Sequence, residues 1–156
     1  IEGIKISKYE TIVTIDGDGQ NNPSDIPVLL KAYIKNPKVG LVSGIRLKRK
    51  DNYIKIISSK IANKIRKYIL NDDCDDTGCS LKVFNKNIFL KFSPFTGLHR
   101  FLPALFKGFG CKTLFIPVSH RKRIYGNSKY GTLKRLIFGC IDIVRVLFIL
   151  KKIRND

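Results

Sequence analysis

Runs of apolar residues bounded by turn residues predict several strands. The first covers residues 11–15, TIVTI, and ends at Asp16. Others are expected at 39–47, VGLVSGIRL, and at 112–120, KTLFIPVSH, because both runs are rich in Val, Ile and Leu. The stretch 81–92, LKVFNKNIFLKF, has the pattern of a strand followed by the start of a helix.

Apolar residues at helical spacing predict the helices between these strands. From 54 to 70 they recur at positions 54, 57, 61, 65, 68 and 69 with Lys and Arg between them, which indicates a helix with a basic outer face. Residues 26–35 predict another helix, with Ser24 as a possible N-cap and Asp25 in its first turn. A short helix is expected within 100–110. Strands that alternate with helices are typical of an α/β fold.

The segment 133–152 is apolar enough to suggest a membrane span. A span requires about 20 mostly uncharged residues, and Arg135, Asp142 and Arg145 interrupt this one. These three residues fall, together with Gly139, near one face of a helix. We therefore expect an amphipathic helix that lies in a membrane interface or packs on the preceding domain.

The composition limits the class of partner. The 156 residues are enough for one domain with a real core. The chain has 30 Lys and Arg against 12 Asp and Glu, and the net charge of +18 implies anionic partners such as nucleic acid, phosphates or an acidic membrane surface, without choosing among them. The chain has no methionine, so we expect it to be a fragment or a processed piece.

The cysteines give little sign of a metal or disulfide framework. There is no CxxC pair among Cys74, Cys79, Cys111 and Cys140, and the chain has only two histidines. A structural zinc site is therefore not expected. We interpret the cysteines as reduced thiols in a cytosolic setting.

The segment DGDGQ, just after the first predicted strand, carries candidate metal ligands. Asp16 and Asp18 are two residues apart, so both carboxylates can approach one hard cation, and Gln20 adds a neutral oxygen. Gly17 and Gly19 let a ligand come close to the backbone. Ligands of α/β folds bind at such strand ends. An acidic turn without a ligand explains the same residues equally well, since Asp and Gly are common in turns.

The segment HRKRIYGNSKYG is a candidate for phosphate binding. Arg121, Arg123 and Lys129 lie among glycines, with the hydroxyl of Ser128 close behind. Arginine fits phosphate oxygens with a two-pronged fork, and lysine adds a point charge. A solvated basic loop is the plainer interpretation of this segment taken alone.

The stretch NDDCDDTGCS has four aspartates in five positions. Clustered like charges repel one another, so at least one of them is expected to meet a cation or a basic side chain. For Asp72, Asp73 and Asp75 we favour a solvated loop. Asp76, next to TGCSLK, is the aspartate that we single out.

Five motifs occur in one order from about residue 3 to residue 145: IVTIDGDGQNNPSDIP, GLVSGIR, DDTGCSLKVFNK, HRFLPAL and SHRKRIYGNSKYG. In this order they resemble family 2 glycosyltransferases, and within them the dolichol-phosphate mannosyltransferase-like group of polyprenyl-phosphate sugar transferases. The resemblance implies an incomplete nucleotide-sugar-binding α/β domain, GT-A-like with a mixed sheet. It would place the carboxyl-terminal part of the catalytic domain in 1–132 and a basic amphipathic interfacial helix in 133–156.

The resemblance also assigns roles to residues. Asp16, Asp18 and Gln20 match a family motif that serves a divalent metal, Mg²⁺ or Mn²⁺, and the nucleotide diphosphate. Arg46 matches a basic position near the donor. Asp18 and Asp76 are the expected catalytic residues, and Asp76 is expected to orient a basic side chain rather than to act as a base.

On the acceptor side, the resemblance points to residues that hold phosphate groups, including that of the lipid: Lys82, Arg121, Arg123, Ser128 and Lys129. His99 and Arg100 match an element for which we expect a supporting role in the core.

The implied reaction is an inverting transfer of a sugar from a nucleotide-diphosphate sugar to a polyprenyl phosphate, in cell-envelope glycan synthesis at the cytoplasmic face of a membrane. A phosphate monoester is mostly dianionic near neutral pH, its second pKa being about 6, so it needs little help from a base. The helices at 54–70 and 133–152 would contact an anionic membrane surface. No counterpart of the family's first, nucleotide-binding strand precedes Ile1, so we expect that this chain alone is not a competent enzyme.

Two alternatives remain. A nucleic-acid-binding module would explain the charge of +18, but it does not explain DGDGQ, and the chain lacks an RNP-like or basic helix-turn-helix signal. Nucleic acid is therefore not the expected partner. A membrane-associated scaffold with a degenerate site is the other alternative, and the intact Asp16, Asp18 and Gln20 argue against it.

Overall fold

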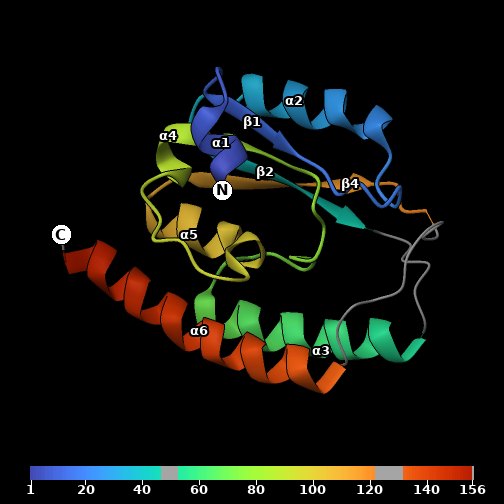
Figure 1. Cartoon of the computed structure of the whole chain (residues 1–156), viewed down its shortest axis with the longest axis vertical. Coiled ribbons are helices and arrows are strands. Elements are labelled where there is room, and N and C mark those ends of the chain that lie inside the picture. Colours follow the sequence, from blue (N-terminus) through green and yellow to red (C-terminus); the bar gives the residue numbers. More distant parts are fainter. Residues whose placement is uncertain (47–52, 122–131, 156) are drawn as a thin grey trace.

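The structure, a computed structural model, describes residues 1–46, 53–121 and 132–155. Each predicted strand and helix is present, with bounds that shift by a few residues at most (Figure 1). The elements are, in chain order, α1 (Glu2–Ile6), β1 (Thr11–Thr14), η1 (Pro23–Asp25), α2 (Ile26–Ile34), β2 (Val39–Arg46), α3 (Tyr53–Leu70), β3 (Lys82–Asn85), α4 (Lys86–Phe89), η2 (Leu98–Arg100), α5 (Leu102–Gly108), β4 (Lys112–Val118) and α6 (Thr132–Asn155).

The strands of the described residues form one mixed sheet in the order β1-β3-β2-β4. β3 runs antiparallel to both of its neighbours, so that Phe84 pairs with Ile12 on one side and with Leu41 on the other. β2 and β4 run parallel, with Ser43 opposite Phe115. The predicted α/β class and mixed sheet are therefore confirmed.

Successive side chains of the strands pack against different helical layers, as the two-residue period of a strand requires. Val42 of β2 and Val83 of β3 pack with the fully buried Leu29 of α2 on one face of the sheet. Leu41 and Phe84, their neighbours in sequence, lie in the second cluster with α5 on the opposite face. Figure 1 shows α2 and α5 on the two sides of the sheet.

Helices α3 and α6 lie side by side and form an outer layer beyond α5 (Figure 1). Val146 and Leu150 of α6 reach the core cluster that includes α5, whereas Phe138 and Phe148 are 60% and 70% exposed. Helix α6 is therefore amphipathic and packs on the domain. Within the described ranges, no helix has an apolar stretch long enough to cross a membrane.

The start of α2 differs from the prediction. The side chain of Asn22 caps the preceding turn η1, where its Oδ1 accepts a hydrogen bond from Ser24 N at 3.3 Å. Asp25 makes no side-chain cap for α2, because its Oδ2 accepts from the backbone N and the hydroxyl of Ser119 at 2.9 and 2.7 Å. The prediction of Ser24 as the N-cap was wrong, since a 3₁₀ turn precedes α2 and moves the cap to Asn22.

Candidate functional site

The topology brings four segments to one edge of the sheet. Strands β1, β2 and β4 point the same way, since β1 and β2 are both antiparallel to β3 and β4 is parallel to β2. Their carboxyl ends therefore lie together with the amino end of β3 (Figure 1). Asp16 and His120 closely follow β1 and β4, Arg46 ends β2, and Lys82 begins β3. Residues far apart in the sequence thus meet at this edge.

The acidic loop leaves β1 in a defined turn. The backbone N of Asp16 donates to Ser80 Oγ at 3.0 Å, and Asp18 Oδ1 accepts from Gln20 N at 3.1 Å. Gly19 has a φ of 74°, a left-handed conformation that glycine adopts without strain. The side chain of Asp16 stays exposed to solvent. The structure thus holds the backbone of the loop while its first carboxylate stays accessible to a ligand.

Ser80 ties this loop to the segment before β3. Its hydroxyl oxygen accepts from Asn21 Nδ2 at 2.7 Å as well as from Asp16 N, and its carbonyl accepts from Thr14 Oγ1 at 2.8 Å. Asn21 is buried, and its Oδ1 lies 3.7 Å from Cys79 Sγ. Sequence reasoning missed Ser80 and Asn21, because a single polar residue beside a motif carries no signal of such a contact.

The basic segment after β4 begins against the acidic loop. Asn21 forms an isolated antiparallel bridge with His120, and Arg121 N donates to Gln20 O at 2.9 Å. The side chain of Arg121 is exposed. The remaining predicted residues of this segment, Arg123, Ser128 and Lys129, lie outside the described residues, so their assignment stays a prediction.

Asp76 and Arg46 form an ion pair within the site. Arg46 Nε and Nη2 donate to the two carboxylate oxygens of Asp76 at 2.7 Å each, and the backbone N of Arg46 donates to Oδ2 at 3.2 Å. Both side chains are largely buried, at 11% and 7% exposed. This geometry suits a carboxylate that orients a basic side chain. The catalytic role of Asp76 and the donor-side role of Arg46 stay predictions.

The other aspartates of the loop are paired as well. Asp72 is fully buried and binds the guanidinium of Arg66, so the expectation of a solvated Asp72 was wrong. Arg66 is the cause, because it enters the core from α3 and requires a counter-charge there. Asp73 and Asp75 are exposed, as predicted, and pair at the surface with Lys107 and Lys67, respectively.

Lys82 is a buried cation at the start of β3. It is 1% exposed, and its Nζ donates to the carbonyl of Cys79 and, at 3.4 Å, to that of Thr77. Burial lowers the pKa of Lys82 below its usual value, because removal from water disfavours the charged form. Its carbonyl partners favour the charged ammonium. Lys82 is therefore held in place by backbone carbonyls, and the negative charge of Asp76 also favours its charged form.

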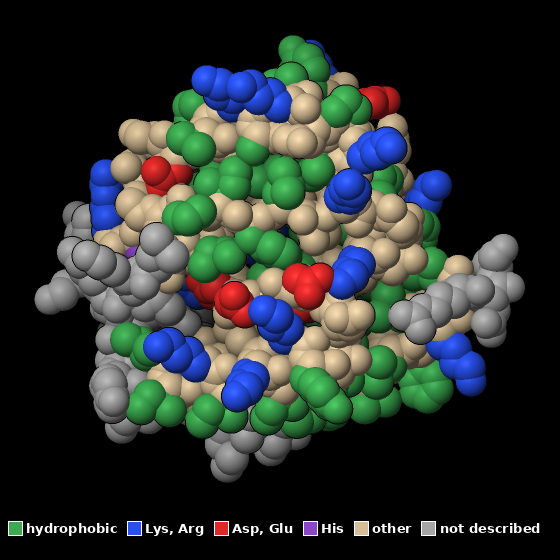
Figure 2. Space-filling model, turned by 180° about the vertical axis from the view of Figure 1, so that it is seen from behind, with side chains coloured by type: hydrophobic (Ala, Val, Ile, Leu, Met, Phe, Trp, Pro, Cys, Tyr) green, Lys and Arg blue, Asp and Glu red, His purple; other side chains and the backbone are tan. Residues whose placement is uncertain are grey.

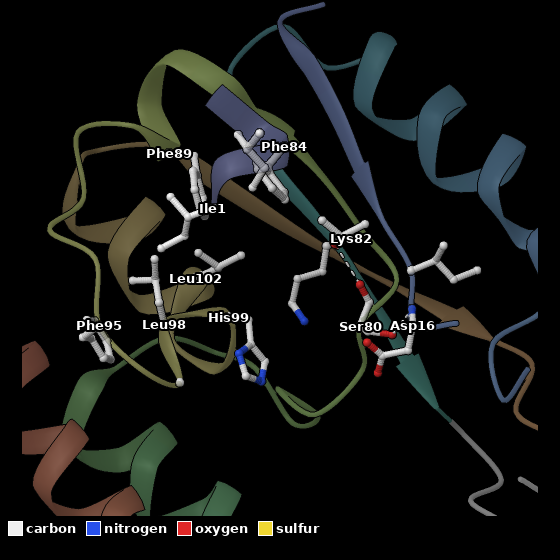
Figure 3. A pocket seen from close by; sticks show the side chains of 14 residues that line it. Ile1, Asp16, Ser80, Lys82, Phe84, Phe89, Phe95, Leu98, His99 and Leu102 are labelled. Atoms are coloured by element: carbon white, nitrogen blue, oxygen red, sulfur yellow. Dashed lines mark hydrogen bonds between the residues drawn. The ribbon is translucent and has the colours of Figure 1, made fainter. Parts of the chain in front are cut away.

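A cavity of about 260 Å³ opens beside Lys82 (Figure 3). Its polar rim includes Asp16, Ser80, Lys82 and His99. Its remaining wall is mostly apolar: Ile1, Ile4, Thr14, Ile15, Phe84, Phe89, Phe95, Gly97, Leu98 and Leu102. In Figure 3 the amine of Lys82 points into the space between His99 on one side and Ser80 with Asp16 on the other. An anionic group in this space would meet the lysine directly.

His99 borders the cavity, whereas we expected it to support the core. Loss of water around the imidazole lowers the pKa of His99, and the positive charges of Lys82 and Arg100 act in the same direction. Arg100 points elsewhere, with its Nη2 3.8 Å from Asp142 of α6. His99 thus lies at the cavity and Arg100 beside α6, and the supporting role expected for both stays a prediction. The motif HRFLPAL gave no means to separate the two.

The acidic loop can offer a divalent cation oxygen ligands only. Carboxylates suit Mg²⁺ and Mn²⁺, which proteins usually hold with one or two carboxylates together with substrate phosphates and water. Among the described residues there is no group of three or more His, Cys, Asp or Glu placed to hold a metal ion. The pair Asp16 and Asp18 fits the sparse type of site that relies on the substrate for its other ligands.

The face of the molecule opposite to that in Figure 1 carries charged side chains near its middle and apolar side chains along one edge. Figure 2 shows Lys or Arg next to Asp or Glu near the middle of this face, and hydrophobic side chains along the lower edge, where α3 and α6 lie. Exposed apolar residues of these two helices include Ile61, Tyr68, Phe138 and Phe148. The outer helical layer therefore presents apolar surface to its surroundings.

Comparison with known proteins gives consistent matches. The family model described as glycosyl transferase family 2 matches residues 1–92. A dodecaprenyl-phosphate galacturonate synthase from Rhizobium johnstonii is 32% identical over 152 residues, which cover 96% of this chain and 44% of the relative. An undecaprenyl-phosphate 4-deoxy-4-formamido-L-arabinose transferase from Aeromonas hydrophila is 31% identical, with 91% of this chain and 43% of the relative covered. The chain thus spans less than half the length of these curated relatives.

Proposed function

Because the chain belongs to glycosyltransferase family 2, we propose that it forms part of the active site of an enzyme that transfers a sugar from a nucleotide-diphosphate sugar to a polyprenyl phosphate at a membrane surface. The names of the relatives from Rhizobium johnstonii and Aeromonas hydrophila both describe transfer to a polyprenyl phosphate. The observation that carries the proposal is the edge of the sheet where the acidic loop, Lys82 and the start of the basic segment meet.

The acceptor side of the proposal rests on Lys82 and Arg121. Lys82 lines the cavity, and Arg121 is tied to the acidic loop through Gln20. A phosphate monoester whose second pKa is about 6 carries nearly two charges at neutral pH. Its approach to a nucleotide diphosphate requires neutralisation, which Lys82 and Arg121 supply.

In the proposed reaction, a phosphate oxygen of the acceptor forms a bond to the anomeric carbon of the sugar. The bond from that carbon to the nucleotide diphosphate breaks, and the diphosphate departs with the electron pair. Attack from the face opposite the leaving group inverts the anomeric centre. No general base is required, because the attacking oxygen is already ionised. The contribution of the protein is to position the reactants and to stabilise charge.

Asp16 and Asp18, with Gln20 beside them, are the proposed ligands of Mg²⁺ or Mn²⁺. When bound, the ion would act as a Lewis acid that stabilises the departing diphosphate. The hydrogen bond from Gln20 N to Asp18 Oδ1 fixes the turn that carries these oxygens, and the hydrogen bond from Asp16 N to Ser80 anchors its start.

The outer layer of α3 and α6 is the proposed contact with the membrane that holds the acceptor. Exposed Ile61 and Phe148 supply apolar surface, and exposed Lys60, Lys64 and Lys151 supply positive charge. Basic helices with an apolar face bind anionic membrane interfaces by burying apolar surface and by electrostatic attraction to the lipid headgroups. The proposed enzyme is therefore peripheral or interfacial, and the resemblance places it at the cytoplasmic face.

Binding measurements test this function on the chain itself. Flotation assays compare two kinds of phosphatidylcholine vesicle with equal negative charge. In one kind the charge comes from polyprenyl phosphate, and in the other it comes from phosphatidylglycerol. We expect tighter binding to polyprenyl phosphate. Equal binding to the two kinds of vesicle would contradict the proposal that the chain recognises polyprenyl phosphate as the acceptor. A shift of duplex DNA or RNA at physiological salt would favour the nucleic-acid-binding alternative.

The metal assignment has its own test. Titration with Mn²⁺ in the presence of nucleoside diphosphates, followed by electron paramagnetic resonance, should show bound Mn²⁺ in the wild-type chain and much less in Asp18→Asn. Binding to phosphatidylglycerol vesicles should not change in this variant, because Asp18 is not part of the surface of α3 and α6 that is the proposed membrane contact. Unchanged Mn²⁺ binding in Asp18→Asn would rule out Asp18 as a ligand.

A further inference from the structure

One face of α3 holds the loop that leads into β3. Asn63, Arg66 and Lys67 are three and four residues apart and therefore lie on one side of the helix. Each contacts a different part of the loop between α3 and β3: Asn63 contacts Thr77, Arg66 contacts Asp72, and Lys67 contacts Asp75. The loop that carries Asp76 is thus attached to α3 along its length.

Arg66 makes the most buried of these contacts. It is 4% exposed and donates to the carboxylate of Asp72 and to the carbonyl of Cys74. The other carboxylate oxygen of Asp72 accepts from Cys74 N at 3.1 Å. A single guanidinium thus binds a side chain and a backbone group of the turn at once, which fixes the turn relative to the helix.

Asn63 continues the connection toward the cavity. Thr77 is buried, and its hydroxyl donates to Asn63 Oδ1 at 3.1 Å. The carbonyl of the same Thr77 accepts from Lys82 Nζ at 3.4 Å. Asp76, the residue before Thr77, binds Arg46 through both carboxylate oxygens. A displacement of Thr77 would therefore move both Lys82 and the partner of Arg46.

The opposite side of α3 makes none of these contacts. Ile57, Ile61 and Ile65 follow one another at four-residue intervals and are exposed, and Tyr68 is 90% exposed. Helix α3 is consequently two-sided: its outer side belongs to the surface layer with α6, and its inner side holds the loop of the site.

We propose that Asn63 and Arg66 are positioning residues: they hold Thr77 and Asp72 so that Lys82 keeps the geometry that binds the acceptor phosphate and the Arg46–Asp76 pair keeps its place in the site. The inference rests on the proposed function in that it takes phosphate as the ligand of Lys82. Neither residue lines the cavity, so both act through the loop. Their role is separate from that of the residues that touch the substrate.

The test compares four variants with the wild-type chain. Asn63→Ala removes the acceptor of the Thr77 hydroxyl, and Asn63→Asp restores an oxygen at that place. Arg66→Lys keeps the charge but loses the fork that reaches both Asp72 and Cys74. Lys67→Gln is the matched control, because it breaks an exposed ion pair to the same loop. Two quantities are measured: the affinity for polyprenyl phosphate in vesicles, and the NMR signal of Arg46 Nε–H.

We expect Asn63→Ala and Arg66→Lys to weaken phosphate binding roughly three- to tenfold, the effect of one hydrogen bond, and to shift the Arg46 signal. Asn63→Asp should recover binding, and Lys67→Gln should resemble the wild type. Thermal unfolding is followed in each variant, and binding is measured well below the unfolding midpoint. All variants are then folded, so differences in affinity do not come from a general loss of stability.

The outcomes separate the two proposals. If the wild type does not distinguish polyprenyl phosphate from other anionic lipids, the proposed function fails, and the Arg46 signal alone decides the positioning role. If Asn63→Ala and Arg66→Lys bind phosphate as the wild type does and leave the Arg46 signal in place, the positioning role is overturned. The positioning role is also overturned if Lys67→Gln changes the Arg46 signal as much as Asn63→Ala and Arg66→Lys do.

Discussion

Two hydrogen bonds of 2.7 Å join the guanidinium of Arg46, at the end of β2, to the carboxylate of Asp76, in the loop before β3. A third contact, from the backbone N of Arg46 to the same carboxylate, fixes the strand end as well as the side chain. The pair connects two segments 30 residues apart in the sequence. Each partner therefore determines where the other lies in the site.

Asp76→Asn should lower the free energy of unfolding by about 3 kcal/mol, because it leaves the buried charge of Arg46 without its counter-charge. Urea denaturation followed by circular dichroism measures this. Asp75→Asn is the matched control: the Lys67–Asp75 pair is exposed, and its loss should cost no more than about 1 kcal/mol. Equal effects of the two substitutions would contradict the importance of the buried pair.

Ser80→Ala should loosen the acidic loop, since it removes the oxygen that accepts from Asp16 N and Asn21 Nδ2. We expect a loss of about 1–3 kcal/mol in the free energy of unfolding. Hydrogen exchange should become faster at the amide of Asp16. Ser24→Ala, at an exposed position, should leave both quantities nearly unchanged. Slow exchange at Asp16 in the Ser80 variant would show that other contacts hold the loop.

Gly97→Ala should be more destabilising than Gly110→Ala. Both glycines have a positive φ, 94° and 75°, so alanine is strained at either place. A Cβ at Gly97 would also lie 2.8 Å from Asp142 Oδ2 and 2.9 Å from Arg100 Nη2, whereas the space at Gly110 is open. We expect a loss of about 1 kcal/mol at Gly110 from backbone strain alone and of about 2–3 kcal/mol at Gly97.

Thermal unfolding of the two variants provides the measurement. Equal shifts in Tm would mean that Asp142 and Arg100 move aside freely. In that case the loop before η2 would not be tightly packed against α6.

Asp142→Asn should change how stability depends on pH. Burial raises the pKa of Asp142 above its usual 3.8, against the opposing effect of Arg100 and Arg145. The folded protein thus holds the proton more tightly than the unfolded chain, so stability falls as the pH rises from 3.8 to the raised pKa and is constant above it. The variant should lose this slope and equal or exceed the wild type in stability at neutral pH.

Urea unfolding across this acidic range provides the comparison. Arg145→Gln serves as a second variant, since loss of a favourable charge should raise the pKa of Asp142 further and widen the range in which stability falls. A slope that survives in Asp142→Asn would assign the effect to another group.

The hydrophobic pattern predicted the strands and the helices α2, α3, α5 and α6, but not the short helix α1. The spacing of Ile57, Ile61 and Ile65 marked α3, and the run 11–15 marked β1. The strand order β1-β3-β2-β4 could not follow from the pattern, because pairing depends on how the connections cross the sheet. The resemblance, rather than any periodicity, implied the mixed sheet.

The site was predictable where charged residues stood in dense motifs. Asp76 was singled out within its cluster, and the structure places it on Arg46. Asp72 was assigned to solvent because the sequence does not show that Arg66 turns inward from α3. Ser80 and His99 are single polar residues, and their contribution depends on contacts between segments that are distant in the sequence.

The cations of the site have consequences for selectivity. Arg46 and Lys82 already donate to oxygens of the protein, a carboxylate for one and backbone carbonyls for the other. An incoming anion at Lys82 therefore shares the ammonium with two backbone carbonyls, and an anion at Arg46 competes with the carboxylate of Asp76. A charge that is already shared holds chloride and other weakly interacting anions poorly, whereas a dianionic phosphate forms stronger hydrogen bonds. The net charge of +18 attracts anions from a distance, and the shared charges at close range would decide which of them stay.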